Sequence, residues 1–312
     1  MAQRTDDPAL AVIAHYTLGL TWCWLGAWPT ARRHLEEGIT RYTPALRQAQ
    51  VFRIGQDLGA GCRLYAALTL WYLGYPAQAQ ARAHETLVLA QDLSHPFTLA
   101  WAHAMGTMVY HMCRDVSAMS EHAEAAVALA TAQGFPLWVT LGTVVRGWAL
   151  AMQGQGEAGV AQIRQGITAF RATGAAITVS WFCILLAEAT AHLGHTAEGL
   201  QSLAEAHTLV EQHDERWWEA EVYRLRGVLL LREPGTSQEE AEAWLQRALD
   251  VARRQEAKSL ELRAAMSLSR LWQQQGKCQE AYDLLAEVYA WFTEGFDTAD
   301  LQDAKALLDT LA

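Results

Sequence analysis

The chain has 312 residues, is 51% hydrophobic and 19% charged, and carries a net charge of −10. This hydrophobic fraction excludes a disordered chain, because disordered segments lack the apolar residues that a core requires. The acidic balance, without a long basic stretch, argues against a protein that wraps nucleic acid.

Turn signals recur along the chain at nearly constant spacing. Between Arg114-Asp115 and Pro234-Gly235 they follow one another every 40 residues. After these turns comes a pattern of small and large residues at helical spacing, such as Gly159/Ile163/Gly166. Small residues at this spacing let two helices approach closely. No segment alternates with period two, so we predict no strands. The repeat therefore predicts helical hairpins stacked into a solenoid.

In chain order, the turns divide the sequence into seven expected hairpins and a terminal helix. The segment 43–56 breaks the period, and we expect it to form a bulging loop with a short helix. A last apolar face must be covered, so the terminal helix is expected to cap the array. We expect residues 1–312 to form one such solenoid. The hairpins are predicted at 8–42, 57–93, 97–133, 136–173, 175–213, 215–255 and 258–293, and the capping helix at 298–311.

The first hairpin carries the order of marker residues that identifies a known repeat. Leu18-Gly19-x2-Trp22 is followed by Gly26, Trp28, Ala31 and Leu35. This order resembles the tetratricopeptide repeat (TPR), although the period of 40 exceeds the usual 34 of that family. The resemblance implies an all-α fold, a right-handed superhelical solenoid of about seven hairpins with longer helices.

A narrower resemblance covers nearly the full chain. Its most specific segment is AKSLELRAAMSLSRLWQQQGK followed by WFTEGFDTADLQDAKALLDTLA. These segments resemble the C-terminal TPR region of large bacterial signalling proteins that also carry a class III adenylate/guanylate cyclase domain and an AAA/STAND-type ATPase. Neither domain is encoded here, since the phosphate loop G-x4-G-K-S/T and the paired aspartates of a cyclase do not occur. The resemblance implies that the chain is a sensing or scaffolding part.

One literal motif match concerns nucleotide binding. Gly154, Gly156 and Gly159 fit the spacing G-x-G-x-x-G. A dinucleotide fingerprint requires a strand before the glycines, whereas a helix is predicted here over 141–152. We therefore interpret the three glycines as the turn of the fourth hairpin.

The TPR resemblance also divides the aromatic residues, including 13 tryptophans, between core and inner face. Trp22, Trp28, Trp244 and Trp272 fall on packing positions. The positions that line the concave face in TPR proteins carry aromatic residues in the first five hairpins and arginines in the last two. These positions are Tyr16, Trp24, Trp71, Tyr72, Trp101, Met108, His111, Trp148, Trp181, Glu188, His192, Glu221, Arg224, Arg232, Arg263, Met266 and Arg270.

Two interpretations of this inner face remain open. The aromatic residues can fill a tightly wound interior, or they can line a groove for an extended peptide or small ligand. Tryptophan offers a large contact area, and arginine binds carboxylate or phosphate in a bidentate fork. The leading functional hypothesis is a non-enzymatic module that binds a peptide, a protein segment such as the parent's ATPase or cyclase domains, or a small ligand. The alternatives are an α/α-toroid enzyme acting on a glycan or apolar substrate, and a scaffold that self-associates through its ends.

The termini and cysteines indicate the cellular setting. No stretch approaches 18 apolar residues, and no basic segment followed by an apolar run opens the chain. We therefore expect neither a membrane span nor a secretory signal. Five scattered cysteines fit neither a disulfide framework nor a zinc site. The sequence predicts a cytoplasmic protein without metal, cofactor, nucleic-acid or membrane partner, and the resemblance to cyclase and ATPase signalling proteins implies a bacterial one.

Overall fold

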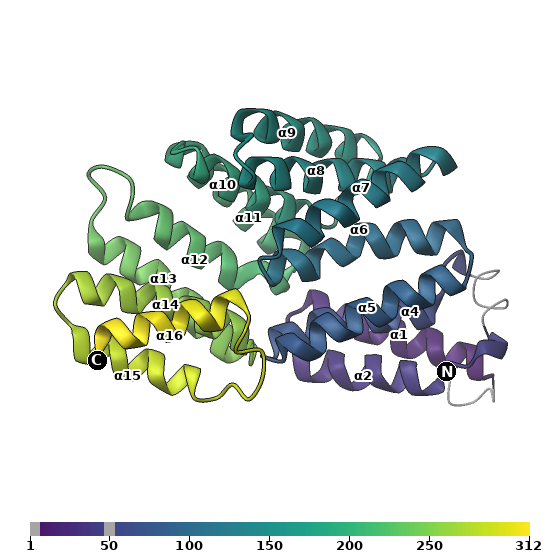
Figure 1. Ribbon diagram of the computed structural model, residues 1–312, viewed down its shortest axis with the longest axis horizontal. Coiled ribbons are helices and arrows are strands. Elements are labelled where there is room, and N and C mark those ends of the chain that lie inside the picture. Colours follow the sequence, from purple (N-terminus) through teal and green to yellow (C-terminus); the bar gives the residue numbers. More distant parts are fainter. Residues whose placement is uncertain (1–6, 47–53) are drawn as a thin grey trace.

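A computed structural model describes residues 7–46 and 54–312, and all regular structure within these ranges is helical. The helices form seven antiparallel hairpins in chain order, followed by one terminal helix (Figure 1). The prediction of an all-α solenoid of TPR-like hairpins is confirmed. The pairs are α1 (Pro8–Trp24) with α2 (Trp28–Arg41), α4 (Leu58–Tyr72) with α5 (Pro76–Asp92), α6 (Pro96–Met112) with α7 (Val116–Gln133), α8 (Pro136–Met152) with α9 (Gly156–Ala172), α10 (Val179–His192) with α11 (Thr196–His213), α12 (Glu219–Leu230) with α13 (Gln238–Arg254), and α14 (Lys258–Gln274) with α15 (Cys278–Tyr289), before the terminal α16 (Ala299–Leu311).

Within the described residues, two short 3-10 helices lie at breaks in the repeat. The first, η2 (Pro44–Leu46), belongs to the segment where we expected a bulging loop with a short helix. Residues 47–53 of that segment lie outside the described ranges. The second, η3 (Arg216–Trp218), leads directly into α12 and buries two tryptophans.

The second hairpin shows how local sequence sets the helix ends. The Asp57 side chain accepts a hydrogen bond of 2.8 Å from the backbone N–H of Ala60, which satisfies a free donor at the start of α4. Gly74 ends the turn with φ +86°, a conformation that glycine adopts without strain. Pro76 then opens α5, where its missing N–H costs nothing.

The glycines of the G-x-G-x-x-G match are explained by helix packing. Gly154 has φ +90° in the turn that follows α8. A Cβ on Gly159 would lie 2.4 Å from the carbonyl oxygen of Gly147, so the backbones of α8 and α9 touch there. A Cβ on Gly156 would lie 2.2 Å from Leu193 in the next hairpin. The motif therefore follows a helix, as expected, and its glycines serve close packing.

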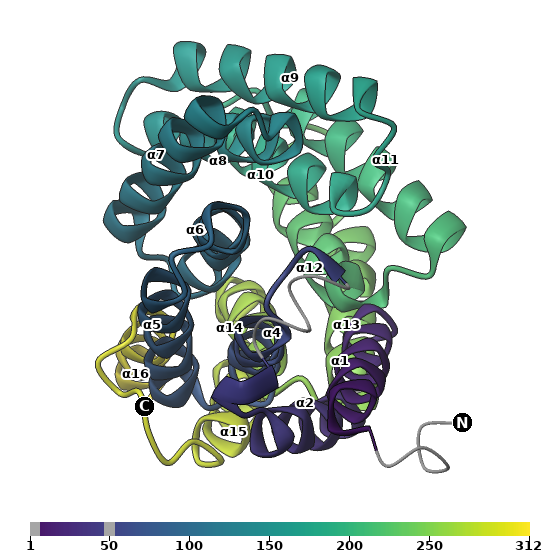
Figure 2. The same cartoon turned by 90° about the vertical axis from the view of Figure 1, so that its right-hand side faces the viewer.

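The array winds so tightly that its first hairpins lie against its last. The start of α14 contacts the end of α4, and α1 contacts η3, so the first and last hairpins meet (Figure 2). The Ser259 hydroxyl at the start of α14 donates a hydrogen bond of 2.5 Å to the Trp71 carbonyl at the end of α4. Trp24 packs against Trp217 with ring centroids 4.2 Å apart. The inner face of the first hairpins is therefore covered by the sixth and seventh.

The tryptophans predicted as core differ in their surroundings. Trp28 is fully buried and stacks on Tyr72 with ring centroids 3.7 Å apart. Trp22 and Trp272 are half-buried and pack against the edge of the core. Trp244 is half-buried between the guanidinium groups of Arg226 and Arg247, 4.2 and 4.7 Å from its ring centre. It also packs against Tyr223 of α12, with ring centroids 5.4 Å apart, so it lies at the edge of the contact between α12 and α13.

Candidate functional site

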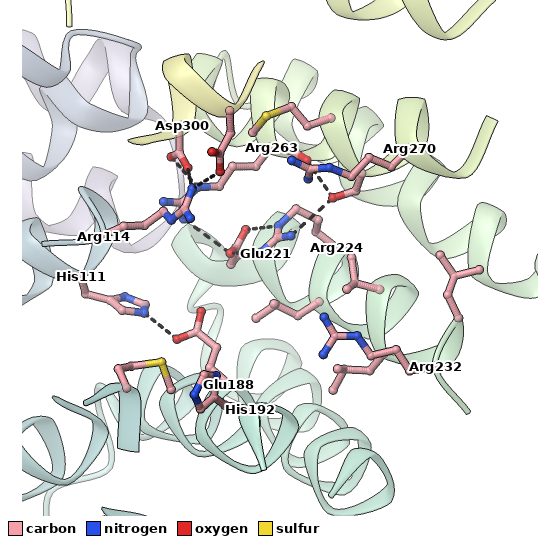
Figure 3. A pocket seen from close by; sticks show the side chains of 18 of the residues that line it. His111, Arg114, Glu188, His192, Glu221, Arg224, Arg232, Arg263, Arg270 and Asp300 are labelled. Carbon is pink, nitrogen blue, oxygen red and sulfur yellow. Dashed lines mark hydrogen bonds and ion pairs between the residues drawn. The ribbon is translucent and has the colours of Figure 1, made fainter. Parts of the chain in front are cut away.

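A cavity of about 930 Å³ opens between two groups of helices (Figure 3). This volume is near the upper end of the range of roughly 300–1,000 Å³ that is typical of ligand sites. One side, which we call the α8–α10 wall, carries His111 from α6, Trp148 and Met152 from α8, and Glu188 and His192 from α10. The opposite side, the α12–α14 wall, is formed by side chains of α12 and α14 and the residues just beyond α12, with α16 at its end. That side contributes Glu221, Arg224, Leu225, Val228, Leu229, Leu231, Arg232, Arg263, Met266, Ser267, Arg270, Leu271, Gln274, Asp300 and Asp303.

The cavity brings together part of the inner face expected from the sequence. Ten of those residues line it: His111, Trp148, Glu188, His192, Glu221, Arg224, Arg232, Arg263, Met266 and Arg270. The other seven do not line it, because the winding of the array packs them into the interior: Tyr16, Trp24, Trp71, Tyr72, Trp101, Met108 and Trp181.

Glu221 forms the buried floor of the α12–α14 wall. Its carboxylate accepts two hydrogen bonds from Arg224, of 2.9 and 2.7 Å, and lies 3.5 Å from Arg263. Burial by itself would raise the pKa of Glu221, but Arg224 and Arg263 outweigh burial and lower this pKa to about 2. Glu221 is therefore a fixed, ionised carboxylate, which does not suit the general acid of a glycan-cleaving enzyme.

Arg263 connects this floor to distant parts of the chain. Its Nε lies 2.8 Å from Asp300 of α16, and its Nη2 donates a hydrogen bond of 2.6 Å to the Met112 carbonyl of α6. Its guanidinium also lies 4.8 Å from the centre of the Trp71 ring. Burial opposes the charge, but Asp300 and Glu221 raise the pKa of Arg263 above its ordinary value. Arg263 is therefore a structural cation that joins α14 to α4, α6 and α16.

Glu188 is the prominent acidic group of the α8–α10 wall. Its Oε2 accepts hydrogen bonds from His111 Nε2, at 2.9 Å, and from Trp148 Nε1, at 2.8 Å. Trp181 Nε1 donates to His111 Nδ1 at 3.2 Å. Because an indole N–H can only donate, Nδ1 must be the unprotonated nitrogen, so His111 is neutral and carries its hydrogen on Nε2. Glu188 is thus held by two neutral donors through one oxygen, and its side chain keeps 22% exposure.

Two arginines of the opposite wall have no ionic partner. Arg232 and Arg270 are exposed at the cavity, and their side chains form neither a hydrogen bond nor an ion pair within residues 7–46 and 54–312. Partial burial lowers the pKa of Arg270, and repulsion by Arg224 and Arg114 adds to this effect against the attraction of Asp303. On balance the fold disfavours the charge of Arg270, although Asp303 and Asp300 attract it.

Most charged side chains of the cavity pair with one another, which leaves a few free to contact a ligand. Asp300 and Asp303 contact Arg114, at 3.3 and 2.6 Å, and Asp300 also holds Arg263. With Glu221 bound to Arg224, three carboxylates and three arginines compensate one another. Glu188 remains on one wall, and Arg232 and Arg270 remain on the other.

Sequence reasoning did not find the contribution of the turn after α6 and of α16. Arg114 was recognised only as a turn residue, and Asp300 and Asp303 only as part of a capping helix. They reach the cavity because the array closes on itself, and no local pattern reports that closure. The described part of the chain contains no group of three or more His, Cys, Asp or Glu side chains that could hold a metal ion.

Comparisons with known proteins identify the architecture. No protein-family model matches the sequence, and no curated protein matches it. Among solved structures, NprR in complex with its cognate peptide NprX has a TM-score of 0.58 and 12% identity, and the match covers 96% of this chain and 82% of that one. A Rap protein complexed with competence and sporulation factor has a TM-score of 0.58 and 10% identity, with 97% of each chain covered. Aspartyl phosphate phosphatase F from Bacillus subtilis has a TM-score of 0.56 and 11% identity, covering 90% of this chain and 70% of that one.

The fold is a TPR-like solenoid. At these identities the likeness concerns the fold alone. In this TPR-like solenoid the cavity lies in the second half of the inner face, where the wall of helices is not covered by the first hairpins. No helix in the described ranges is long and apolar enough to cross a bilayer.

Proposed function

We propose that the chain is a peptide-binding repeat module and that its ligand occupies the cavity between the α8–α10 and α12–α14 walls. The observation that carries this proposal is the cavity itself, which combines about 930 Å³ of space with both apolar and uncompensated charged side chains. Apolar surface provides affinity, and a few placed polar groups orient a ligand. The peptide in the similarly folded NprR complex supports a peptide as the occupant.

The lining favours a peptide over a uniformly polar ligand. Met152 on one wall faces Val228, Leu231 and Met266 on the other. Methionine side chains adapt to ligand groups of varied shape, because their three torsions rotate freely and sulfur is polarisable. Alternating apolar and polar side chains of an extended peptide suit such a lining.

We further propose that binding has a regulatory and not a catalytic outcome. The resemblance to the TPR region of bacterial cyclase and ATPase signalling proteins supports a cytoplasmic sensing module that controls such a partner domain. Glu221 and Asp300 support the same proposal, because arginines immobilise these carboxylates and leave them unsuited to proton transfer.

Blocking the cavity tests the proposal. Val228→Trp would place an indole inside the cavity, whereas Val88→Trp makes the same change at an exposed position of α5. Equilibrium dialysis against a pool of random pentapeptides, read by mass spectrometry, should show peptides retained by the wild type and by Val88→Trp. Retention should fall about tenfold or more in Val228→Trp, because the indole fills the part of the cavity that the peptide would occupy. Equal retention by all three proteins, or by none, would contradict the proposal.

A further inference from the structure

We propose that the bound peptide is dipolar, with a cationic group against Glu188 and carboxylate groups against Arg232 and Arg270. This inference rests on the proposed peptide-binding function and specifies its ligand. The structure supports it through the separation of uncompensated charge across the cavity. In Figure 3, Glu188 extends from α10 on one side, while Arg224, Arg263 and Arg270 come from the opposite side.

Glu188 is prepared to receive a cation. Its Oε2 is oriented by His111 and Trp148, and no hydrogen bond within the described residues uses its Oε1. The His111 contact would be an ion pair only with a protonated imidazole, which the Trp181 donor at Nδ1 opposes. Within the described residues no lysine or arginine pairs with Glu188, and Arg263 attracts its charge at longer range. A carboxylate held in one orientation binds an ammonium or guanidinium group through a short charge-assisted hydrogen bond. Little side-chain entropy is lost in such a contact, because the carboxylate is already fixed.

Arg232 and Arg270 are prepared to receive an anion. Arg224 also lines this wall, but its Nε and Nη2 already donate hydrogen bonds to Glu221. The two remaining guanidinium groups offer five N–H donors each and can bind a carboxylate in a bidentate fork. Partial burial weakens the hydration of Arg270 and, with repulsion by Arg224 and Arg114, lowers its pKa despite the attraction of Asp303. An incoming carboxylate would relieve that repulsion, and this relief adds to the attraction.

The same charges disfavour other peptides. A purely acidic peptide would bring a carboxylate toward Glu188, and a purely basic peptide would meet two uncompensated arginines. Like charges placed together in a partly desolvated site reduce affinity, so they provide specificity. The remaining charges of the cavity do not alter this pattern, because Asp300, Asp303 and Glu221 are paired with Arg114, Arg224 and Arg263.

Four pools of capped pentapeptides test the inference. Each has an acetylated N-terminus, an amidated C-terminus and three randomised apolar residues between two fixed ends. The ends are one Lys and one Glu in either order, two Glu, two Lys, or two Gln. Equilibrium dialysis should show the mixed pool bound about tenfold more tightly than the Gln pool, because each charged contact adds affinity. The Lys pool should bind most weakly.

Single isosteric changes then assign each contact. Glu188→Gln retains an acceptor for His111 and Trp148 but removes the charge, so the mixed pool should lose its advantage over the Glu pool. Arg270→Gln and Arg232→Gln, which break no ion pair, should each weaken binding of the mixed and Glu pools severalfold. The controls Glu124→Gln and Arg33→Gln make the same changes at exposed sites outside the cavity and should leave all affinities unchanged.

The possible outcomes separate the two proposals. If the wild type retains all four pools equally, peptide binding stands and the dipolar ligand is refuted. The same conclusion follows if the mixed pool keeps its advantage in Glu188→Gln. If the wild type retains none of the pools while it does retain random peptides with free ends, capped charged side chains are not the recognised groups, and the dipolar inference fails. If it retains no peptide of any kind, the proposed function fails as well.

Discussion

Arg263 and Arg270 lie two helical turns apart on α14, and both contact the same cavity, yet their surroundings give them opposite roles. Arg263 is buried among Asp300, Glu221 and the Met112 carbonyl. Arg270 forms no ion pair within the described residues, and partial burial lowers its pKa despite the attraction of Asp303. A charge that the fold disfavours is typical of a residue kept for binding.

This contrast predicts different costs of substitution. Arg263→Gln should lower the free energy of unfolding by about 3 kcal/mol or more, because it leaves buried carboxylates without their cation. Arg270→Gln should change it by less than about 0.5 kcal/mol, or increase it, because no ion pair is lost. Urea unfolding of both variants at neutral pH measures the difference. A similar loss in both would contradict the assignment of Arg270 as a binding residue.

Glu221 predicts a specific dependence on pH. Its pKa is about 2 in the fold and 4.5 for an ordinary glutamate. Its contribution to stability is therefore complete above about pH 4.5 and is lost as the pH falls toward 2. The shift corresponds to a contribution on the order of 3 kcal/mol. Glu221→Gln, which cannot titrate, should be less stable at pH 7, and its deficit should shrink below about pH 4.5. If the difference in free energy of unfolding between the wild type and Glu221→Gln stays constant from pH 7 to pH 3, the ionised Glu221 carboxylate is not its cause.

At the scale of helices, local sequence was sufficient to predict the hairpins. Turn glycines such as Gly74 and the small residues that face them report contacts between neighbours in the chain, so the repeat is visible without a structure. The open part of the inner face was not predictable in the same way. Trp71 belongs to the inner face by its repeat position, but it is covered by Arg263, almost two hundred residues later. Such a contact depends on how far the array winds, which is the sum of many small rotations between hairpins.

The close contact of α8 and α9 gives a prediction at this scale. An alanine at Gly159 would place its Cβ 2.4 Å from the Gly147 carbonyl oxygen and 2.6 Å from the Ala151 nitrogen. Because both atoms are backbone, Gly159→Ala should cost about 1–3 kcal/mol of stability or more. Gly106 of α6 is the control, since a Cβ there meets no atom within 4 Å. Gly106→Ala should be neutral or stabilise by up to about 1 kcal/mol. Thermal melts compare the two, and equal losses would show that α8 and α9 do not touch.

For the whole molecule, closure of the array explains both what the site contains and what it lacks. The last hairpins cover the aromatic inner face of the first hairpins, through contacts such as Trp24 with Trp217 and Ser259 with Trp71. The aromatic residues of the first half therefore stabilise the winding, as one of the two sequence-based interpretations expected. The groove of the other interpretation is confined to the second half, where arginines and Glu188 line it. Because the first and last hairpins touch, part of the inner face is covered and the remainder forms a bounded cavity.

The location of bound peptide tests this central claim most directly. A capped pentapeptide with Lys and Glu ends and a central benzophenone-bearing residue can be irradiated with the full chain, and the adducts mapped by mass spectrometry. Met152 and Met266 line the cavity on opposite walls, and methionine is a favoured target of the excited benzophenone. Adducts at these residues or their neighbours on α8, α12 and α14, lost in Val228→Trp, are the expected result. Adducts confined to the outer helices α9, α11 and α13, and unchanged in Val228→Trp, would contradict a binding cavity between the two walls.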